Sequence, residues 1–97
     1  MSREAIYRSP QDLDGVECFR VTGSIPLMPL HTDDFAATTA EDILPQGRFV
    51  LESPALTQLK RRRANRSNVM WFYVQTEGGR RGWVSEQALL MKHIAIL

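Results

Sequence analysis

The stretch Val69–Met70–Trp71–Phe72–Tyr73–Val74–Gln75–Thr76 decides the fold class. Most of these residues are β-branched or aromatic, the types that fit the pleated and half-buried surface of a sheet, so we predict a strand over 69–76. The next residues, Glu77–Gly78–Gly79–Arg80, predict a tight hairpin, because Gly-Gly tolerates the positive φ that a two-residue hairpin turn requires. Gly82–Trp83–Val84–Ser85 then returns as the second strand of this hairpin.

Further strand signals lie on both sides of the hairpin. A short turn at Glu86–Ala88 leads into Leu89–Leu97, whose apolar content is typical of a closing strand. Upstream, Arg48–Glu52 is a strand candidate. It follows a turn at Leu44–Gly47, which has Pro at its second position and Gly at its fourth.

The first half of the chain adds one clear strand and one irregular strand. Polar and apolar side chains alternate over Val16–Thr22. Ile25–Met28 follows as an edge or kinked strand, because Pro26 and Pro29 cannot donate to a ladder. Five to six short strands, with at most a short helical turn, predict an all-β protein built as a small barrel or sandwich.

Three segments are expected to lie outside the strands. Residues 1–15 are polar and rich in turn formers, so we expect a loosely packed N-terminal arm and a domain that spans 16–97. Residues 29–43 form a long polar connection. Residues 54–68 form a second long loop, which displays a run of basic residues.

The composition fits a single folded domain. A chain of 97 residues has room for one compact core, and 43% hydrophobic with 24% charged residues is ordinary for a globular protein. The one cysteine, Cys18, cannot form an internal disulfide, and the first residues show no secretory signal, so we expect a cytoplasmic protein. No apolar run approaches the roughly 18 residues of a membrane span.

Charge is distributed unevenly along the chain. Residues 1–47 carry eight acidic and three basic residues, whereas residues 48–97 carry three acidic and nine basic residues. The net charge of +1 is too small to indicate a nucleic-acid-binding protein from composition alone.

Several short motifs together resemble a bacterial SH3-like domain over about residues 18–92. They are Leu44–Pro45–Gln46–Gly47 before a strand, Trp71–Phe72–Tyr73–Val74, the glycine-containing hairpin, and Gly82–Trp83–Val84 followed by Glu86–Gln87–Ala88–Leu89. In that family, a Gly-Trp-Val strand leads into a single helical turn and a last strand. The resemblance implies an SH3-like barrel of about five to six strands with long loops.

The residues that carry enzymatic chemistry are sparse. His31 and His93 lie far apart, Cys18 has no evident base, and the sequence shows neither a glycine-rich phosphate loop nor the spacing of a metal site. The adjacent Asp33 and Asp34 are too few to supply the oxygen ligands of calcium and are expected to be a solvated loop. We therefore expect no enzyme, no cofactor and no metal.

Aromatic residues of the 69–76 strand are the first candidate binding site. Alternation puts Phe72 and Val74 in the core and leaves Trp71 and Tyr73 half exposed. By resemblance to eukaryotic SH3 domains, an exposed tryptophan here lines a peptide groove together with a neighbouring loop. The groove would then consist of Trp71, Tyr73, His31, Asp33, Asp34 and Phe35. The alternative is that Trp71 packs under the 54–68 loop and Trp83 under the N-terminal arm.

Basic residues are the second candidate site. They are Lys60, Arg61, Arg62, Arg63, Arg66, Arg80 and Arg81. Two interpretations are open: these residues contact phosphates or an acidic face of a protein, or they are only solvated. No aromatic residue is interleaved with the arginines of the run itself, so the sequence does not favour base stacking.

The sequence thus favours a non-enzymatic protein-interaction module, an adaptor or an inhibitor, that acts through the aromatic face and the basic loop. The alternative is a nucleic-acid-associated barrel that binds phosphates through Lys60–Arg66 and Arg80–Arg81, and a third hypothesis is a peptidoglycan or cell-wall module. A homodimer is also compatible with the sequence, through an unpaired strand edge near Pro26–Met28 or at Ile94–Leu97.

Overall fold

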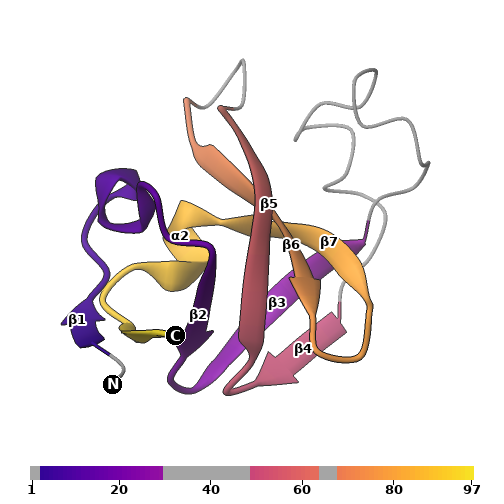
Figure 1. Cartoon of the computed structure of the whole chain (residues 1–97). Coiled ribbons are helices and arrows are strands. Elements are labelled where there is room, and N and C mark those ends of the chain that lie inside the picture. The colour runs from indigo at the N-terminus through magenta and orange to yellow at the C-terminus, as the bar shows by residue number, and fades with distance from the viewer. Residues whose placement is uncertain (1–2, 30–48, 64–67) are drawn as a thin grey trace.

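The computed structural model describes residues 3–29, 49–63 and 68–97, and these form one antiparallel sheet that curls into a half-barrel (Figure 1). The strands are β1 (Arg3–Ile6), β2 (Cys18–Val21), β3 (Ser24–Pro29), β4 (Phe49–Glu52), β5 (Ala55–Arg63), β6 (Met70–Thr76), β7 (Arg81–Ser85) and β8 (His93–Ile96). Their order across the sheet is β1-β8-β2-β5-β6-β7-β3-β4. The all-β class is confirmed, but the described residues form eight strands where five to six were expected.

Two short helices join the strands in the described part of the chain. A 3-10 turn, η1 (Pro10–Leu13), precedes β2, and a single helical turn, α2 (Glu86–Leu89), follows β7 where the sequence predicted a turn. The Ser85 hydroxyl begins α2 by accepting a hydrogen bond from the backbone N–H of Ala88. In the described part of the chain, no helix has the length and apolar character needed to cross a membrane.

The β6–β7 hairpin forms where the sequence predicted it, with a different turn. Thr76 and Arg80 bracket a three-residue loop, and Gly79 donates to the carbonyl of Thr76 at 3.0 Å. Gly79 alone adopts the left-handed conformation in this turn, at φ 86°, while Gly78 does not. The expected two-residue turn is therefore wrong, and the hairpin has a three-residue loop that ends in one left-handed glycine.

Strand β5 occupies most of the segment that was expected to be a loop over 54–68. It is a central strand, paired with β2 on one side and β6 on the other. A β-bulge between Gln58 and Lys60 shifts its register against β6 and leaves Leu59 40% exposed. The bulge breaks the two-residue alternation that identifies a strand in a sequence, which is why the strand was missed.

The two strand edges proposed from the sequence are not open. β3 lies between β4 and β7, and β8 lies between β1 and β2 (Figure 1). Among the described strands, the sheet instead ends at β1 and β4.

The N-terminal segment belongs to the core, so the expectation of a loose arm over residues 1–15 is wrong for the described part. β1 pairs with β8, and both Tyr7 and Leu13 are fully buried. The Tyr7 ring meets Phe72 edge-on, with the centroids 6.3 Å apart. Gln58 of β5 donates to the carbonyls of Leu13 and Val16, at 3.1 and 2.8 Å. Two apolar residues in a polar stretch are a weak sequence signal, yet they anchor the segment.

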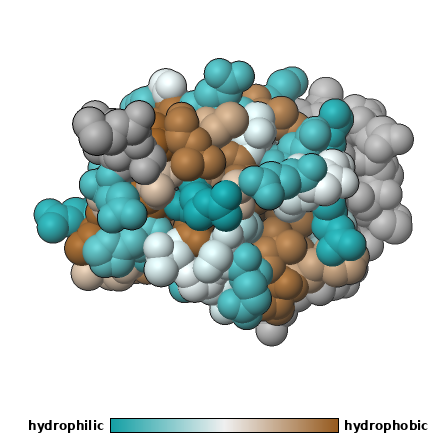
Figure 2. All heavy atoms as spheres, turned by 60° about the horizontal axis from the view of Figure 1, so that its bottom comes forward, coloured by the Kyte–Doolittle hydropathy of each residue, from teal (hydrophilic) through white to brown (hydrophobic). Residues whose placement is uncertain are grey.

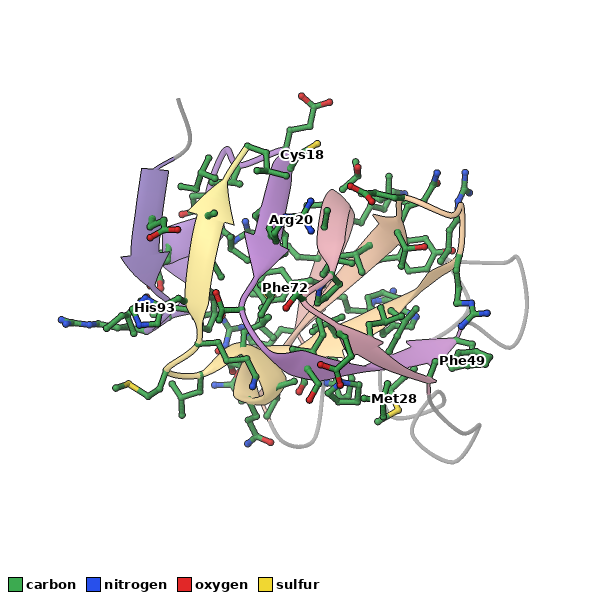
Figure 3. All side chains as sticks on the ribbon, turned by 90° about the horizontal axis from the view of Figure 1, so that it is seen from below. Cys18, Arg20, Met28, Phe49, Phe72 and His93 are labelled. Carbon is green, nitrogen blue, oxygen red and sulfur yellow. The ribbon has the colours of Figure 1, made fainter. Side chains whose placement is uncertain are left out.

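The buried side chains of the described residues form two clusters on opposite faces of the sheet. The main core contains Tyr7, Leu13, Phe19, Val21, Ile25, Leu27, Leu56, Phe72, Val74, Val84, Leu89 and Ile94. Phe72 lies in the middle of the curled sheet, whereas Met28 and Phe49 lie toward its periphery (Figure 3). A second cluster consists of Trp71 and Trp83, with Met28, Val69 and Tyr73 packed against them.

Replacing Gly82 with alanine tests the close contact between β7 and β3. A Cβ at Gly82 would lie 2.6 Å from the carbonyl oxygen of Met28, which is backbone and cannot rotate away. We expect Gly82→Ala to lower the free energy of unfolding by about 2–4 kcal/mol, measured by urea denaturation with tryptophan fluorescence.

The matched control is Gly78→Ala in the hairpin loop. A Cβ there meets nothing closer than the Thr76 hydroxyl oxygen, at 3.9 Å. This variant should stay within about 0.5–1 kcal/mol of the wild type. Equal stability of the two variants would contradict the described packing of β3 on β7.

Candidate functional site

Side chains on the convex side of β5, β6 and β7 form a continuous surface, which we call the outer face. Residues directly opposite each other in a sheet point to the same side, so the register assigns its members. Lys60, Tyr73 and Trp83 lie in one row, Arg62, Trp71 and Ser85 in a second row, and Thr57, Gln75 and Arg81 in a third. The outer face thus combines aromatic and basic residues from three strands.

Trp71 is buried, at 6% exposure, which corrects the expectation that it is half exposed. Alternation placed it correctly on the face opposite Phe72. The exposure was wrong because Trp71 forms a cluster with Trp83, which is itself fully buried. Trp83 also contacts Met28 and Tyr73 in this cluster, so in the described residues it packs on the outer face rather than under the N-terminal segment.

Tyr73 is half-buried, as the alternation predicted. Its ring lies against Trp83, with the centroids 5.1 Å apart and the planes at 44°. The contact fixes the orientation of the Tyr73 ring and leaves part of its side chain at the surface. Tyr73, rather than Trp71, is therefore the accessible aromatic residue of the outer face among the residues predicted as a groove.

The other predicted groove residues lie outside the described part of the chain. They are His31, Asp33, Asp34 and Phe35. Arg66 of the basic run also lies outside it.

The basic run divides between the two faces of the sheet, because it lies on a strand and not on a loop. Lys60 and Arg62 belong to the outer face, and Arg61 between them points to the inner side, opposite Phe72. Arg61 forms an ion pair with Asp14 and donates to the carbonyls of Pro10 and Leu13, at 3.3 and 2.9 Å. Its guanidinium lies 5.5 Å from the centroid of the Phe72 ring. Arg61 therefore fastens the N-terminal segment.

The remaining described arginines also differ in their surroundings. Arg63 donates to the carbonyl of Asn68 at 2.9 Å. The guanidinium of Arg80 lies 3.9 Å from the centroid of the Phe49 ring, whereas Arg81 donates to the side-chain oxygen of Gln75 at 2.8 Å. Arg80 and Arg81 thus contact different elements, and only Arg81 belongs to the outer face.

Aromatic and basic residues alternate on the outer face in space, although they do not in the sequence. Lys60 lies opposite Tyr73 and Arg62 opposite Trp71, because β5 and β6 are hydrogen-bonded neighbours. The sequence hid this arrangement because the pairs are 13 and 9 residues apart and the expected loop had no register with β6.

An open cleft of about 360 Å³ lies at one border of the outer face. Residues 15–17 form one wall, and the bulged part of β5 from Gln58 to Arg61 forms the other. The half-exposed Leu59 supplies an apolar surface to the cleft, and Lys60 joins it to the outer face. The bulge creates this feature, so no sequence signal indicated it.

Two ionisable groups of the N-terminal segment have shifted pKa values for structural reasons. The backbone N–H groups of Arg8 and Ser9 donate to the carboxylate of Asp12, at 2.7 and 3.2 Å, and lower its pKa. Burial raises the pKa of Tyr7, with a smaller contribution from Glu86. Both groups support the packing of this segment and lie away from the outer face.

Comparisons with known proteins identify no relative of this chain. No family model, curated protein or solved structure matches it. The resemblance to bacterial SH3-like domains stays a prediction.

The structural role of Arg61 can be tested by truncation. Arg61→Ala removes the ion pair with Asp14 and the hydrogen bonds that the guanidinium donates to the carbonyls of Pro10 and Leu13. We expect the free energy of unfolding to fall by about 1–3 kcal/mol in urea denaturation.

Arg63→Ala is the matched control, because Arg63 is exposed and its hydrogen bond is local, to Asn68. It should change stability by no more than about 0.5 kcal/mol. An equally small effect of Arg61→Ala would show that the contacts of Arg61 do not help to hold the N-terminal segment.

Proposed function

We propose that this protein is a non-enzymatic interaction domain, an adaptor or an inhibitor, whose outer face binds an acidic segment of a partner protein. The observation that carries the proposal is the row Lys60, Tyr73 and Trp83. It combines an oriented, partly accessible aromatic ring with a cation on the adjacent strand.

Tyr73 has the properties of an interface anchor. Tyrosine gives a large contact area with few rotatable bonds, and its hydroxyl can pair with a polar group of the partner. Here the contact with Trp83 already restricts the ring, so little conformational entropy is lost on binding. Trp71 and Met28 support Trp83 from within the same cluster.

The charges of the outer face favour an acidic partner. Lys60, Arg62 and Arg81 are basic, and none of the nine residues that define the face is acidic. Complementary charge accelerates encounter and excludes partners of the same sign. The cleft beside Lys60 offers an apolar contact at Leu59 for a neighbouring side chain of the same segment.

The single cysteine, Cys18, is a free thiol, which suits the reducing cytoplasm.

Nucleic-acid binding is the second candidate, and one observation favours it. Tyr73 and Trp71 lie opposite Lys60 and Arg62, which is the combination of stacking and phosphate contact that single-strand binders use. Against it, Trp71 is buried and Arg61 is engaged by Asp14, so fewer rings and cations of the basic run face outward than the sequence suggested. The protein partner therefore ranks first.

The test compares tagged wild-type protein with outer-face variants in pull-downs from the native extract, with and without nuclease. Proteins that the wild type retains after nuclease treatment are identified, and their affinity is then measured with each purified variant. We expect Tyr73→Ala to weaken binding by roughly 30-fold. The double variant Lys60→Glu with Arg62→Glu should lose more affinity at low salt than at high salt, because salt screens exposed charges. Trp71 is left intact, because its truncation would open a cavity.

Arg8→Glu with Lys92→Glu is the control for charge, since neither residue belongs to the outer face. It should leave the affinity within about 3-fold of the wild type. Thermal denaturation of every variant checks that the fold is retained. Retention of nucleic acid instead of protein, with a steep dependence on salt, would favour the second candidate. Full binding by the Tyr73 and Lys60–Arg62 variants would reject the outer face as the site.

A further inference from the structure

Strand β5 is longer than its neighbour β2, so its second half has a side along which no described strand lies. The ladder between β2 and β5 ends where Gln58 donates to the carbonyl of Glu17, at 2.7 Å. Beyond this point β5 continues to Arg63, and in the described part of the chain it pairs there with β6 alone. Figure 1 shows this half of β5 rising past the end of β2. We call this side of Leu59–Arg63 the β5 edge.

The hydrogen bonds of β6 show which of its residues bond to β5. In an antiparallel sheet, successive residues bond alternately to the strand on one side and to the strand on the other. Thr76 donates to the carbonyl of Arg80, the residue opposite it in the β6–β7 hairpin, at 2.8 Å. The even-numbered residues of β6 therefore bond to β7, and the odd-numbered residues bond to β5.

Backbone groups of Arg61 and Arg63 consequently point away from β6. Lys60 and Arg62 lie opposite odd-numbered residues of β6, so their N–H and C=O groups bond to that strand. Arg61 and Arg63 alternate with them and direct their N–H and C=O groups to the β5 edge. Before the bulge the same rule assigns Gln58 to the side of β2, and its bond to Glu17 agrees.

Space for another strand lies beside this edge. The chain before β2 turns at Gly15, which has φ 73°, and a Cβ there would meet no atom within 4 Å. The open cleft of about 360 Å³ separates Gly15–Glu17 from Gln58–Arg61. The preceding Leu13 is bonded by the side chain of Arg61, which points to the inner side of the sheet. The N-terminal segment is thus fastened by side chains on the inner side.

The β5 edge is strongly basic. After Leu59 the strand reads Lys60–Arg61–Arg62–Arg63. A bulge and like charges are devices by which natural sheets prevent an edge from pairing with a copy of itself, so a second copy of this chain is disfavoured here. An acidic strand is favoured by the same charges. On the side of the molecule where β4 and the β6–β7 hairpin lie, small apolar patches alternate with hydrophilic ones (Figure 2), so that side favours no single class of partner.

We infer that the acidic segment of the partner protein binds as an added strand, antiparallel to β5, along the β5 edge. The inference rests on the proposed function, because it specifies how the same partner is held. The added strand continues the line of β2, which is also antiparallel to β5. Its backbone bonds to Arg61 and Arg63. In this mode of recognition, main-chain hydrogen bonds supply affinity and alternate side chains supply specificity.

The register predicts the side-chain pattern of the partner segment. Residues of the added strand opposite Arg62 and Lys60 point to the outer face, because opposite residues share a side. The segment should therefore carry acidic residues at positions i and i+2. Beyond the second acidic residue the segment reaches the bulge, where Leu59 lines the cleft and offers an apolar contact. Tyr73 lies one strand further and contacts another part of the partner.

A synthetic heptapeptide tests this pairing. It has glutamate at its second and fourth positions, leucine at its sixth and threonine elsewhere. The wild-type chain is titrated with it and followed by NMR. Such a short strand buries less than the 1,200–2,000 Å² of a typical stable interface, so we expect a dissociation constant of about 10–500 µM, which rises with salt.

Two N-methylated forms of the peptide separate backbone pairing from attraction between charges. The third residue lies opposite Arg61, so methylation of its nitrogen removes a hydrogen bond to the β5 edge and should weaken binding by roughly 10-fold or more. The fourth residue lies opposite Lys60, and its N–H points away from β5. Methylation there is the matched control, and binding should stay within about 3-fold of the unmodified peptide.

Amide hydrogen exchange shows where the peptide binds on the protein. With saturating peptide, the Arg61 and Arg63 amides should become protected by roughly 10-fold or more. The Arg62 amide is the internal control, because its bond to β6 protects it with or without the peptide.

Two variants of Arg63 test the same bond from the side of the protein. Arg63→Pro removes an N–H that points to the edge and no bond to β6, whereas Arg63→Ala removes the same charge and keeps the N–H. The proline variant should bind the peptide roughly 5-fold more weakly than the alanine variant. If Arg63→Pro does not fold, the methylated peptides and the amide exchange decide.

Absence of peptide binding, binding that is indifferent to methylation of the third residue, or absence of protection at Arg61 and Arg63 would each overturn the added strand. The proposed function fails separately. It is rejected when the native partner binds the Tyr73 and Lys60–Arg62 variants fully, whatever the peptide does.

Discussion

The bulge at Leu59 in β5 is the constraint on which the rest of the structure depends. Before it, Gln58 lies opposite Val74 on the inner side of the sheet, and after it Arg61 lies opposite Phe72 on that same side. One inserted residue thus turns Arg61 inward and leaves Lys60 and Arg62 outward. The inward residues fasten the N-terminal segment, and the outward ones make the outer face basic. A regular strand would reverse these assignments, because a shift of one residue exchanges the two sides.

The parts of the fold that were predictable are those with strong local signals. The β6–β7 hairpin follows from a dense aromatic strand and two glycines, and α2 follows from a short turn after Gly82–Ser85. β5 was not predictable, because its bulge hides the alternation and its basic residues are typical of loops. The packing of Tyr7 and Leu13 was not predictable either, since it depends on the pairing of β1 with β8, which lies at the other end of the chain.

The sequence predicted on which face of the sheet the candidate site lies, but not how exposed its side chains are. Alternation places Trp71 and Tyr73 together, opposite Phe72, and the register confirms this. Exposure depends on what lies beside a residue in space. Trp71 shares a cluster with Trp83 and is buried, whereas Tyr73 rests on Trp83 and stays half-buried. The pairing of Lys60 with Tyr73 needed the β5–β6 register, which no pattern within a single strand contains.

One strand links the outer face to the open edge of the sheet. The first half of β3 pairs with β4 and its last two residues, Met28 and Pro29, pair with β7. Pro26 explains the division: its nitrogen points away from β4, toward the side of β7, where it has no hydrogen to donate. The ladder with β7 consequently begins at Met28, and the same residue packs beneath Trp83. The prolines that suggested an edge strand instead divide β3 between two neighbours. This division leaves β4 as the final strand, with its outer hydrogen-bonding groups facing away from the sheet.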